Sequence, residues 1–539
     1  MIRKIVCIQM NGEFPDFTHR LVMPDYGLPL IGTLLAKEGY DVRLFIEHVQ
    51  PPNWEAIRQS DLVCFSTLNA GADKVYKLAG RIRAELGIPT VLGGTHASYY
   101  PEAALEHCDY VVFGEGDETI VELVATLSAK GDPADVRGIA FRDGKRTHRT
   151  PTRPGPERFD TAPDFSLIQG YRQMTMLDML RQRRRPLLTA QASRGCQFKC
   201  TFCIVNTMFP TGYRKRDIES VIADLRDKRR YGSNLMFVDN DFTMKRKETK
   251  RLLRRIIEEK LGYKFVVFAR TEIARDKELL DLMREAGVTS VYQGYESIRA
   301  DTLESYEKHQ TLAQIETAIS TLHAHGFQIL GSFVVGADTD TVDSLQDTVE
   351  FVRRQNLTYA YFFPIWGHYP EQMNGYRTIV PWYRSIFHSW KYSDGNFVTH
   401  YPLRMSPSRL QRLVIDAYDK LYGPAEIVRA VKRNDLPSAR GKSLHWYSWH
   451  RVRKAMVEYV PFLREVERDL YDDDGTLREE ALLQRVSADA RWSFREGNRT
   501  VEALGLSPLQ LPVPRSRNIT CVPPKLDPRP IPAADSVES

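Results

Sequence analysis

The chain has 539 residues, of which 42% are hydrophobic and 27% are charged, and its formal net charge is +6. This composition is typical of a globular protein and excludes collagen-like, low-complexity and disulfide-dense chains. The length predicts two to four domains, and the mild positive charge suits an anionic cofactor without indicating nucleic-acid binding.

The N-terminus leads directly into a strand-like segment at 4–10, with no pattern typical of a signal peptide. No apolar run approaches the roughly 18 residues that a membrane-spanning helix needs. We therefore expect a cytoplasmic protein without a membrane span. In a reducing compartment, clustered cysteines favour metal or redox chemistry over structural disulfides. The short basic run at 181–185 would suit phosphate, although such runs more often form solvated surface.

The first 148 residues alternate short apolar runs with amphipathic, helix-like stretches. This alternation predicts a doubly wound, Rossmann-like α/β domain with a parallel sheet, with strands at 4–10, 41–47, 61–67, 88–94, 109–116 and 137–144. Ligands of such sheets bind beyond the carboxyl ends of the strands. Small or polar residues occupy those ends: Ser66, Thr67, Asn69, Gly93, Gly94, Thr95, His96, Gly114, Glu115 and Gly116.

A Pro-rich linker is predicted at 149–184, and the strand–helix alternation then resumes over 185–370. Six strand–helix units fit this region, whereas eight would close a complete barrel. The pattern predicts an open, partial (β/α)6 TIM barrel. A mainly helical C-terminal substrate or cap domain is expected at 371–520, followed by a disordered tail at 521–539.

Three of the seven cysteines, Cys196, Cys200 and Cys203, lie within eight positions. A structural zinc site needs four ligands, so this group would have to recruit one of His19, His48 or His96. A dithiol pair formed by Cys200 and Cys203 would leave Cys196 without a role. An iron–sulfur cluster held by three thiolates explains the number, because it leaves one iron open for a reactive ligand.

The spacing Cys196-x-x-x-Cys200-x-Phe202-Cys203, placed after the first barrel strand, resembles the radical S-adenosylmethionine (SAM) signature. The resemblance implies a 4Fe-4S cluster on the three cysteines, with SAM chelating the open iron through its amino and carboxylate groups. It also implies an electron donor such as flavodoxin or ferredoxin, whose electron cleaves SAM to a 5'-deoxyadenosyl radical.

The same resemblance implies SAM contacts at the ends of the barrel strands. The residues at the matching positions are Phe202, Asp239, Asp241, Arg270, Glu296, Gly331 and Gly336. A guanidinium suits the methionine carboxylate, and a carboxylate suits the ammonium or ribose hydroxyls. Each acid also has a simpler interpretation as a helix cap or solvated loop end. The family's Gly-Gly-Glu stretch is replaced here by 239–242.

Segments 24–45 and 91–120 resemble the cobalamin-binding domain that precedes many radical SAM barrels. The Asp-x-His-x-x-Gly motif of histidine-ligated cobalamin is missing after the first strand. The resemblance therefore implies cobalamin without a histidine on cobalt, with Met10 and Asn11 facing its lower side. The nucleotide tail would insert along Ser66–Asn69, Gly93–Thr95 and Gly114–Gly116. Alternatively, the domain has lost its cofactor and only supports the barrel.

The two resemblances together imply methylation of an unactivated carbon of a small-molecule substrate (a natural product, a lipid or a tetrapyrrole-like compound), through the 5'-deoxyadenosyl radical and methylcobalamin. Oxidative cyclisation or rearrangement on the same architecture is the alternative, and a cobalamin or cluster sensor is a third. His368, Tyr369 and Glu371 follow the sixth barrel strand and are candidate substrate contacts. The aromatic-rich stretches at 369–405 and 443–452 suit either a substrate pocket or a helical cap packed on the barrel.

Overall fold

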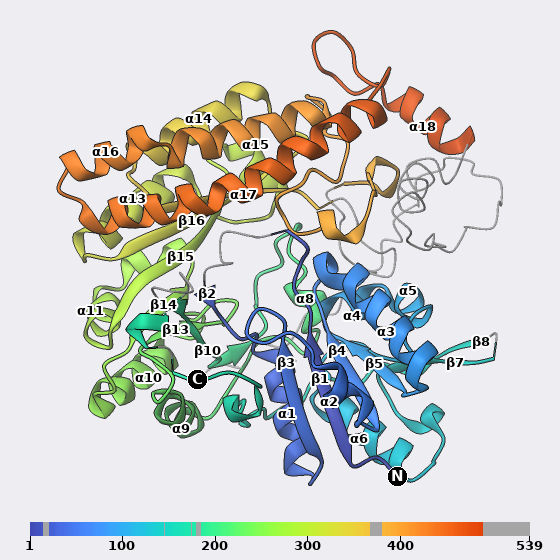
Figure 1. Ribbon diagram of the computed structural model, residues 1–539. Coiled ribbons are helices and arrows are strands. Elements are labelled where there is room, and N and C mark those ends of the chain that lie inside the picture. The colour runs from blue at the N-terminus through green and yellow to red at the C-terminus, as the bar shows by residue number, and fades with distance from the viewer. Residues whose placement is uncertain (15–20, 145, 174, 179–184, 367–379, 489–539) are drawn as a thin grey trace, which may run out of the picture.

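The computed structural model describes residues 1–14, 21–144, 146–173, 175–178, 185–366 and 380–488. Two sheets of mainly parallel strands lie side by side, and long C-terminal helices lie beside the second sheet (Figure 1). The α/β class is therefore confirmed, with a Rossmann-like N-terminal domain, a partial barrel and a helical C-terminal region.

The N-terminal sheet has the order β3-β1-β4-β5-β6-β7-β8. Its strands are β1 (Lys4–Gln9), β3 (Asp41–Ile46), β4 (Leu62–Ser66), β5 (Thr90–Gly93), β6 (Tyr110–Val112), β7 (Ile139–Asp143) and β8 (Arg146–Arg149). Consecutive residues of β1 pack into opposite cores, Ile5 and Cys7 into one and Val6 and Ile8 into the other. Helices on both faces bury these strands, which explains their continuous apolar runs.

The segment predicted at 137–144 is a strand, but it does not extend the parallel set. β7 runs antiparallel to β6 and forms a hairpin with β8, which the sequence pattern did not predict. The antiparallel pair lies at the edge of the sheet, beyond the strands that form its ligand-facing end. The doubly wound core therefore consists of the parallel strands β3, β1, β4, β5 and β6. Its helices include α1 (Gly27–Lys37), α3 (Ala72–Leu86) and α6 (Asp117–Ser128).

The second sheet contains six parallel strands in chain order, as predicted for the partial barrel. They are β10 (Leu188–Ala190), β13 (Asn234–Phe237), β14 (Lys264–Phe268), β15 (Val288–Glu296), β16 (Gln328–Val335) and β17 (Tyr359–Pro364). The intervening helices include α9 (Ile218–Lys228), α10 (Arg246–Glu259), α11 (Lys277–Glu285), α13 (Leu312–Ala324) and α14 (Val342–Arg354).

Two tyrosines of α15 (Pro407–Tyr422) hydrogen-bond to backbone groups at the edge of β17, the last strand of the second sheet. The Tyr418 hydroxyl bonds the backbone N–H and C=O of Phe362, and the Tyr422 hydroxyl does the same for Ala360. An open barrel leaves a strand edge with unpaired polar groups, and these hydroxyls replace a seventh strand. The C-terminal helices are therefore part of the barrel's hydrogen bonding.

The C-terminal region continues with α16 (Pro424–Lys432), α17 (Leu436–Val466) and α18 (Glu479–Ala488). In the stretch 443–452, His445 packs against Tyr359 of β17 and Trp449 packs against Tyr418. Both side chains are buried. For these residues the structure therefore favours packing on the barrel over a substrate pocket.

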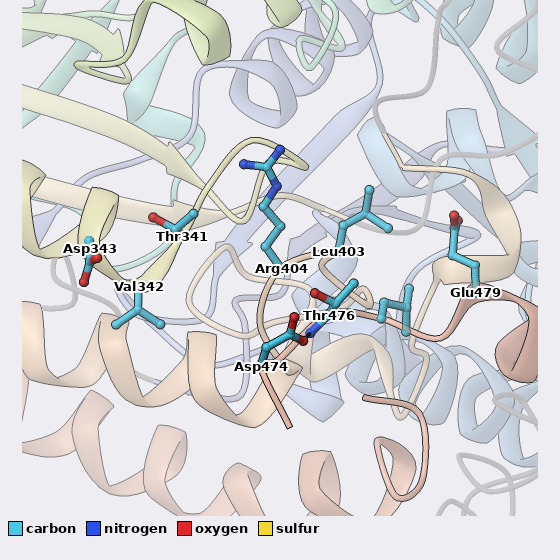
Figure 2. Close-up of a pocket in the computed structure, with 9 residues that line it drawn as sticks. Thr341, Val342, Asp343, Leu403, Arg404, Asp474, Thr476 and Glu479 are labelled. Carbon is cyan, nitrogen blue, oxygen red and sulfur yellow. Dashed lines mark hydrogen bonds between the residues drawn. The ribbon is translucent and has the colours of Figure 1, made fainter. Parts of the chain in front are cut away.

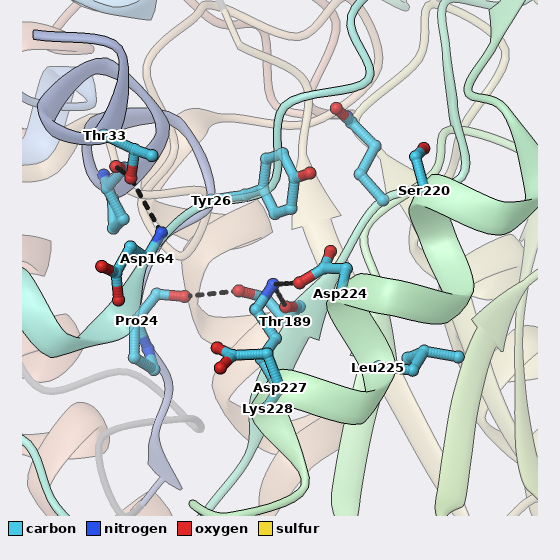
Figure 3. A network of polar contacts seen from close by, with 12 residues as sticks. Pro24, Tyr26, Thr33, Asp164, Thr189, Ser220, Asp224, Leu225, Asp227 and Lys228 are labelled. Carbon is cyan, nitrogen blue, oxygen red and sulfur yellow. Dashed lines mark hydrogen bonds and ion pairs between the residues drawn. The ribbon is translucent and has the colours of Figure 1, made fainter. Parts of the chain in front are cut away.

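A buried charge network joins the first helix, the linker and the barrel (Figure 3). Lys228 of α9 pairs with Asp224 at 2.7 Å and donates to the Thr189 carbonyl of β10 at 2.8 Å. Arg216 donates to Asp224 Oδ2 at 3.0 Å and to the Tyr26 hydroxyl at 2.9 Å. Burial lowers the pKa of Lys228, so Asp224 is needed to hold two cations in the interior.

Several sequence predictions fall outside the described residues. These are the substrate candidates His368, Tyr369 and Glu371, the tail at 521–539, His19, and most of the basic run at 181–185. In the part of the chain that the structure describes, no helix is long and apolar enough to cross a membrane.

Candidate functional site

The three cysteines lie in the loop of a hairpin that follows β10. Strand β11 (Ser193–Arg194) pairs antiparallel with β12 (Arg214–Lys215), and the cysteine loop lies between them. At Gly195 the backbone has φ +79°, and an added Cβ would overlap the Gly212 carbonyl. Only glycine suits this position, because it combines left-handed backbone with a close approach of the opposite strand.

The chemistry of the loop fits three thiolate ligands held close together. Burial raises the pKa of Cys196 and raises that of Cys203 to about 11, and the neighbouring Cys200 adds to both shifts. Backbone N–H groups of Phe198 and Val205 oppose these shifts at Cys196 and Cys203, as donors to thiolate sulfur would.

A single metal ion needs its ligands at one point, whereas three thiolates on a cluster each hold a different iron. Among the described residues, no three His, Cys, Asp or Glu side chains are gathered for a single metal ion. Three thiols within one loop suit an iron–sulfur cluster, and the described residues offer the zinc interpretation no fourth ligand.

Asp239, Asn240 and Asp241 follow strand β13, and the first two hold the start of the cysteine hairpin. Asp239 accepts from the Ala192 amide at 3.0 Å and from the Ser193 hydroxyl, and burial raises its pKa to about 6. Asn240 Oδ1 accepts from the Gly195 amide at 3.1 Å. Asp241 accepts from the amide and hydroxyl of Thr243. Both oxygens of Asp239 therefore position the loop, and Asn240 is a contact that the sequence analysis did not identify.

Arg270 and Glu296 lie at the ends of the next two strands. The Arg270 guanidinium lies 3.9 Å from the centre of the Phe198 ring in the cysteine loop, and it pairs with Glu272 at 3.1 Å. Glu296 has φ +63° and forms a buried ion pair with Lys308 at 2.7 Å. This strained backbone turns the carboxylate toward Lys308 in the space that Gly294, without a Cβ, leaves open.

Lys308 was not identified from the sequence, since a lone lysine after α12 (Ala300–Ser305) has no distinctive spacing. Its charge opposes the rise in pKa that burial causes at Cys203, and its ammonium lies 5.8 Å from the centre of the Phe202 ring. Phe202 also packs edge-to-face on Tyr306 at 5.2 Å. Two cations, Arg270 and Lys308, therefore lie beside the thiols.

The two glycines predicted on β16 occupy different environments. Gly331 lies within the strand, where an added Cβ would be 2.8 Å from the Tyr295 ring. Gly336 follows the strand with φ +92°, and its amide donates to Asp340 at 2.8 Å. His400 of the C-terminal region donates to the Gly336 carbonyl at 2.9 Å. Of the two, only Gly336 lies at the carboxyl end of the strand.

The cobalamin candidates gather at the carboxyl edge of the N-terminal sheet, as predicted. An added Cβ at Gly94 would lie 2.9 Å from Ser66 Oγ and 3.2 Å from the Thr67 carbonyl, and the Thr67 hydroxyl donates to the Met10 carbonyl. The remaining candidates flank these residues: Asn69, Gly93, Thr95, Gly114 and Gly116.

At the same edge, Gln9 Oε1 is a buried acceptor with no hydrogen-bond partner among the described atoms. Asn11 is bound to His48 through its side chain at 2.8 Å. His96 is buried between Asn69 and Tyr76, and burial lowers its pKa to about 3, so its ring is neutral.

Glu115, a predicted cobalamin contact, binds the cysteine hairpin. Its two oxygens accept from Arg194 at 3.1 Å and from Arg214 at 2.6 Å, across the boundary between the two sheets. The Tyr99 hydroxyl of α4 (Thr95–Tyr99) makes a second contact, bonding Thr207 at 2.7 Å just beyond Cys203. The cysteine hairpin is therefore held against the ligand edge of the N-terminal domain.

A surface cavity of about 530 Å3 lies between the start of α14 and the C-terminal region (Figure 2). Thr341, Asp343, Arg404, Asp474 and Glu479 are among its lining residues. None of the three cysteines and none of the predicted cofactor residues lines it. It is therefore separate from the site at the two strand edges.

Comparison with known families agrees with the geometry. Residues 191–352 match the radical SAM superfamily, and residues 17–124 match the B12 binding domain. This chain contains both a B12-binding domain and a radical SAM domain. The radical SAM match begins just before the cysteine hairpin and ends within α14. The B12-binding match contains the carboxyl ends of β3, β4, β5 and β6.

This chain is similar both to a methyltransferase and to a cyclase. An uncharacterised methyltransferase of Pyrococcus horikoshii is 30% identical over 53% of this chain and 62% of its own length. The anaerobic magnesium-protoporphyrin IX monomethyl ester cyclase of Rubrivivax gelatinosus is 30% identical over 53% and 52%. The chain thus spans less than two thirds of the length of either relative.

Among solved structures, the radical SAM methyltransferase TsrM of Kitasatospora setae, with cobalamin and a [4Fe-4S] cluster bound, matches with a TM-score of 0.61. The match covers 86% of this chain and 100% of that one at 18% identity. At this level of identity the likeness establishes the fold, in which a B12-binding domain precedes a radical SAM domain.

Proposed function

We propose that the protein is a cobalamin-dependent radical SAM enzyme that methylates an unactivated carbon of a small molecule. The observation that carries this proposal is the contact between the two candidate cofactor sites. Tyr99 and Glu115, which follow strands of the B12-binding domain, bond directly to the hairpin that holds the cysteines. A substrate bound between these edges would reach both cofactors.

When bound, the reduced cluster would cleave SAM to a 5'-deoxyadenosyl radical and cobalamin would deliver the methyl group. The chain's own residues supply the binding. Cys196, Cys200 and Cys203 would hold the cluster. The Arg270 guanidinium would bind the methionine carboxylate of SAM, which would replace Glu272 as its partner. Glu296, with Lys308 as its counter-ion, would accept from the ammonium or the ribose hydroxyls. An electron donor such as flavodoxin or ferredoxin would reduce the cluster.

At the carboxyl edge of the N-terminal sheet, the backbone around Gly94 and Thr67 would accommodate the cobalamin tail. Met10 and Asn11 would face the lower side of cobalt. His48 Nδ1 is bound to the Asn11 side chain, and both ring nitrogens of His96 are bound within the protein, to Tyr76 and Asn69. These contacts support cobalamin held without a histidine on cobalt.

The decisive experiment is anaerobic reconstitution of the full chain with iron, sulfide and hydroxocobalamin. The parent protein is expected to take up a cluster and, with dithionite and SAM, to release 5'-deoxyadenosine. Cys196→Ala, Cys200→Ala and Cys203→Ala should abolish both cluster uptake and release. Cys108→Ala, which removes a buried thiol remote from the hairpin in sequence, is the control and should retain both. Equal iron content in all four variants would contradict the proposal.

Cyclisation is the second candidate, because the Rubrivivax gelatinosus cyclase is as similar in sequence as the methyltransferase of Pyrococcus horikoshii. Incubation with SAM labelled by deuterium in its methyl group distinguishes the two. The substrate is supplied as an extract of the producing cells. A methylated product is then three mass units heavier than the product made with unlabelled SAM, whereas a cyclised product carries no label.

A further inference from the structure

Two arginines face each other at the base of the hairpin that carries the cysteines. Arg194 and Arg214 are paired across β11 and β12, and their side chains are 6% and 10% exposed. Like charges directly opposite in a β-ladder destabilise it, and burial makes an uncompensated cation costly. The hairpin therefore needs a counter-charge to close.

That counter-charge comes from the B12-binding domain. Glu115 is 3% exposed, and each of its oxygens binds a different strand of the hairpin: Oε2 lies 3.1 Å from Arg194 Nη1, and Oε1 lies 2.6 Å from Arg214 Nη2. Asp117 Oδ2 accepts from Arg194 Nη1 at 2.9 Å. Two carboxylates thus balance two guanidiniums, and both oxygens of Glu115 are used within the protein.

The linker encloses this four-residue cluster. The Phe159 ring lies 4.5 Å from the Arg194 guanidinium and 5.8 Å from that of Arg214. At Gly155 an added Cβ would overlap Glu115 Oε1, so the linker backbone lies directly against the carboxylate. Arg214 also donates to the Pro156 carbonyl at 2.6 Å. These contacts exclude water, which strengthens the ion pairs.

We propose that Glu115 is a positioning residue, which sets the place of the cysteine loop relative to the B12-binding domain. This inference rests on the proposed function, in which the loop holds the cluster. Arg194 is two residues before Cys196, and the intervening Gly195 is held by Asn240. A displacement of Arg194 therefore moves the first cluster ligand. This role stands in place of the cobalamin contact that the sequence predicts for Glu115.

The test uses the full chain, reconstituted anaerobically with iron, sulfide and hydroxocobalamin. Glu115→Gln keeps the shape of the side chain and removes its charge. We expect it to lose iron to a ferrous chelator at least about tenfold faster than the parent, because a buried pair is broken. It should also alter the electron paramagnetic resonance spectrum of the reduced cluster. Cobalamin content per chain should stay at the parental level.

Two further variants make the result specific. Glu122→Gln removes a carboxylate of α6 that pairs with Arg153 and is 44% exposed, and it should match the parent in every measurement. Glu115→Gln combined with Arg214→Gln leaves Arg194 balanced by Asp117. This double variant should lose iron more slowly than Glu115→Gln alone, a rescue that general unfolding would not produce.

Parental iron loss with reduced cobalamin content in Glu115→Gln would overturn the proposal and assign the carboxylate to cobalamin. Parental values of both would overturn it as well. A parent protein that takes up no iron would refute the proposed function instead. In that case, proteolysis within 195–213 that is faster in Glu115→Gln than in Glu122→Gln would still support the positioning role, and equal proteolysis would end it.

Discussion

Arg194 and Glu115 form a buried ion pair between a residue next to the cysteine loop and the ligand edge of the N-terminal sheet, with 3.1 Å between Nη1 and Oε2. The two residues are 79 positions apart, and they belong to different domains. This ion pair, together with loop packing, sets the distance between the two candidate cofactor sites.

The linker offers a way to disturb this pair without changing a charge. Gly155→Ala places a methyl group against Glu115 Oε1 and 2.8 Å from Arg214 Nη1. We expect the free energy of unfolding to fall by about 1–3 kcal/mol, because the carboxylate or the linker must shift. Gly80→Ala is the control, since an added Cβ there meets nothing within 4 Å. Urea unfolding monitored by circular dichroism measures both, and equal stability of the two variants would refute the expected overlap.

The network at the junction of the first helix and the barrel predicts an asymmetry between two neighbouring acids of α9. Asp224→Asn leaves Arg216 and Lys228 buried without a counter-ion, and should destabilise the protein by about 3–5 kcal/mol. Asp227→Asn alters an exposed pair with Arg230 and should change stability by less than about 1 kcal/mol. Thermal unfolding of the two variants measures the difference. Similar melting temperatures would mean that Asp224 does not compensate the two cations.

Features formed by residues that are close in sequence could be predicted from the sequence. Strand β1 and its neighbours could be predicted because each is a short apolar run that ends in small or polar residues. The cysteine site could be predicted because its three candidate ligands lie within one loop. Contacts between segments that are distant in sequence could not be predicted, because only the folded chain brings those segments together. Examples are the partners of Glu115, the buried Lys308 and the hydroxyls of Tyr418 and Tyr422.

The Glu296–Lys308 pair predicts an effect on SAM binding. Lys308→Gln removes the ammonium that lies 2.7 Å from the carboxylate and beside the cysteine loop. Without this ammonium the buried carboxylate loses the partner that holds it in place, and SAM binding should weaken by about tenfold or more. Anaerobic titration calorimetry on the reconstituted protein gives the dissociation constant. Lys277→Gln, which alters a surface pair, should leave that constant unchanged. Unaltered affinity in Lys308→Gln would place SAM away from Glu296.

His400 predicts a loss of stability in acid. Its buried ring donates from Nε2 to the Gly336 carbonyl, with burial and the nearby Arg384 lowering its pKa to about 4. Because this value lies below the roughly 6.5 of an unfolded histidine, the neutral ring stabilises the fold fully above pH 6.5. That contribution is lost as the pH falls toward 4, amounting to about 2 kcal/mol by pH 5. Urea unfolding at pH 7.5 and pH 5.0 measures the loss. His400→Gln, which keeps an N–H donor, should lose correspondingly less than the parent between these two pH values. An identical loss in the variant would show that His400 titrates normally in the folded protein.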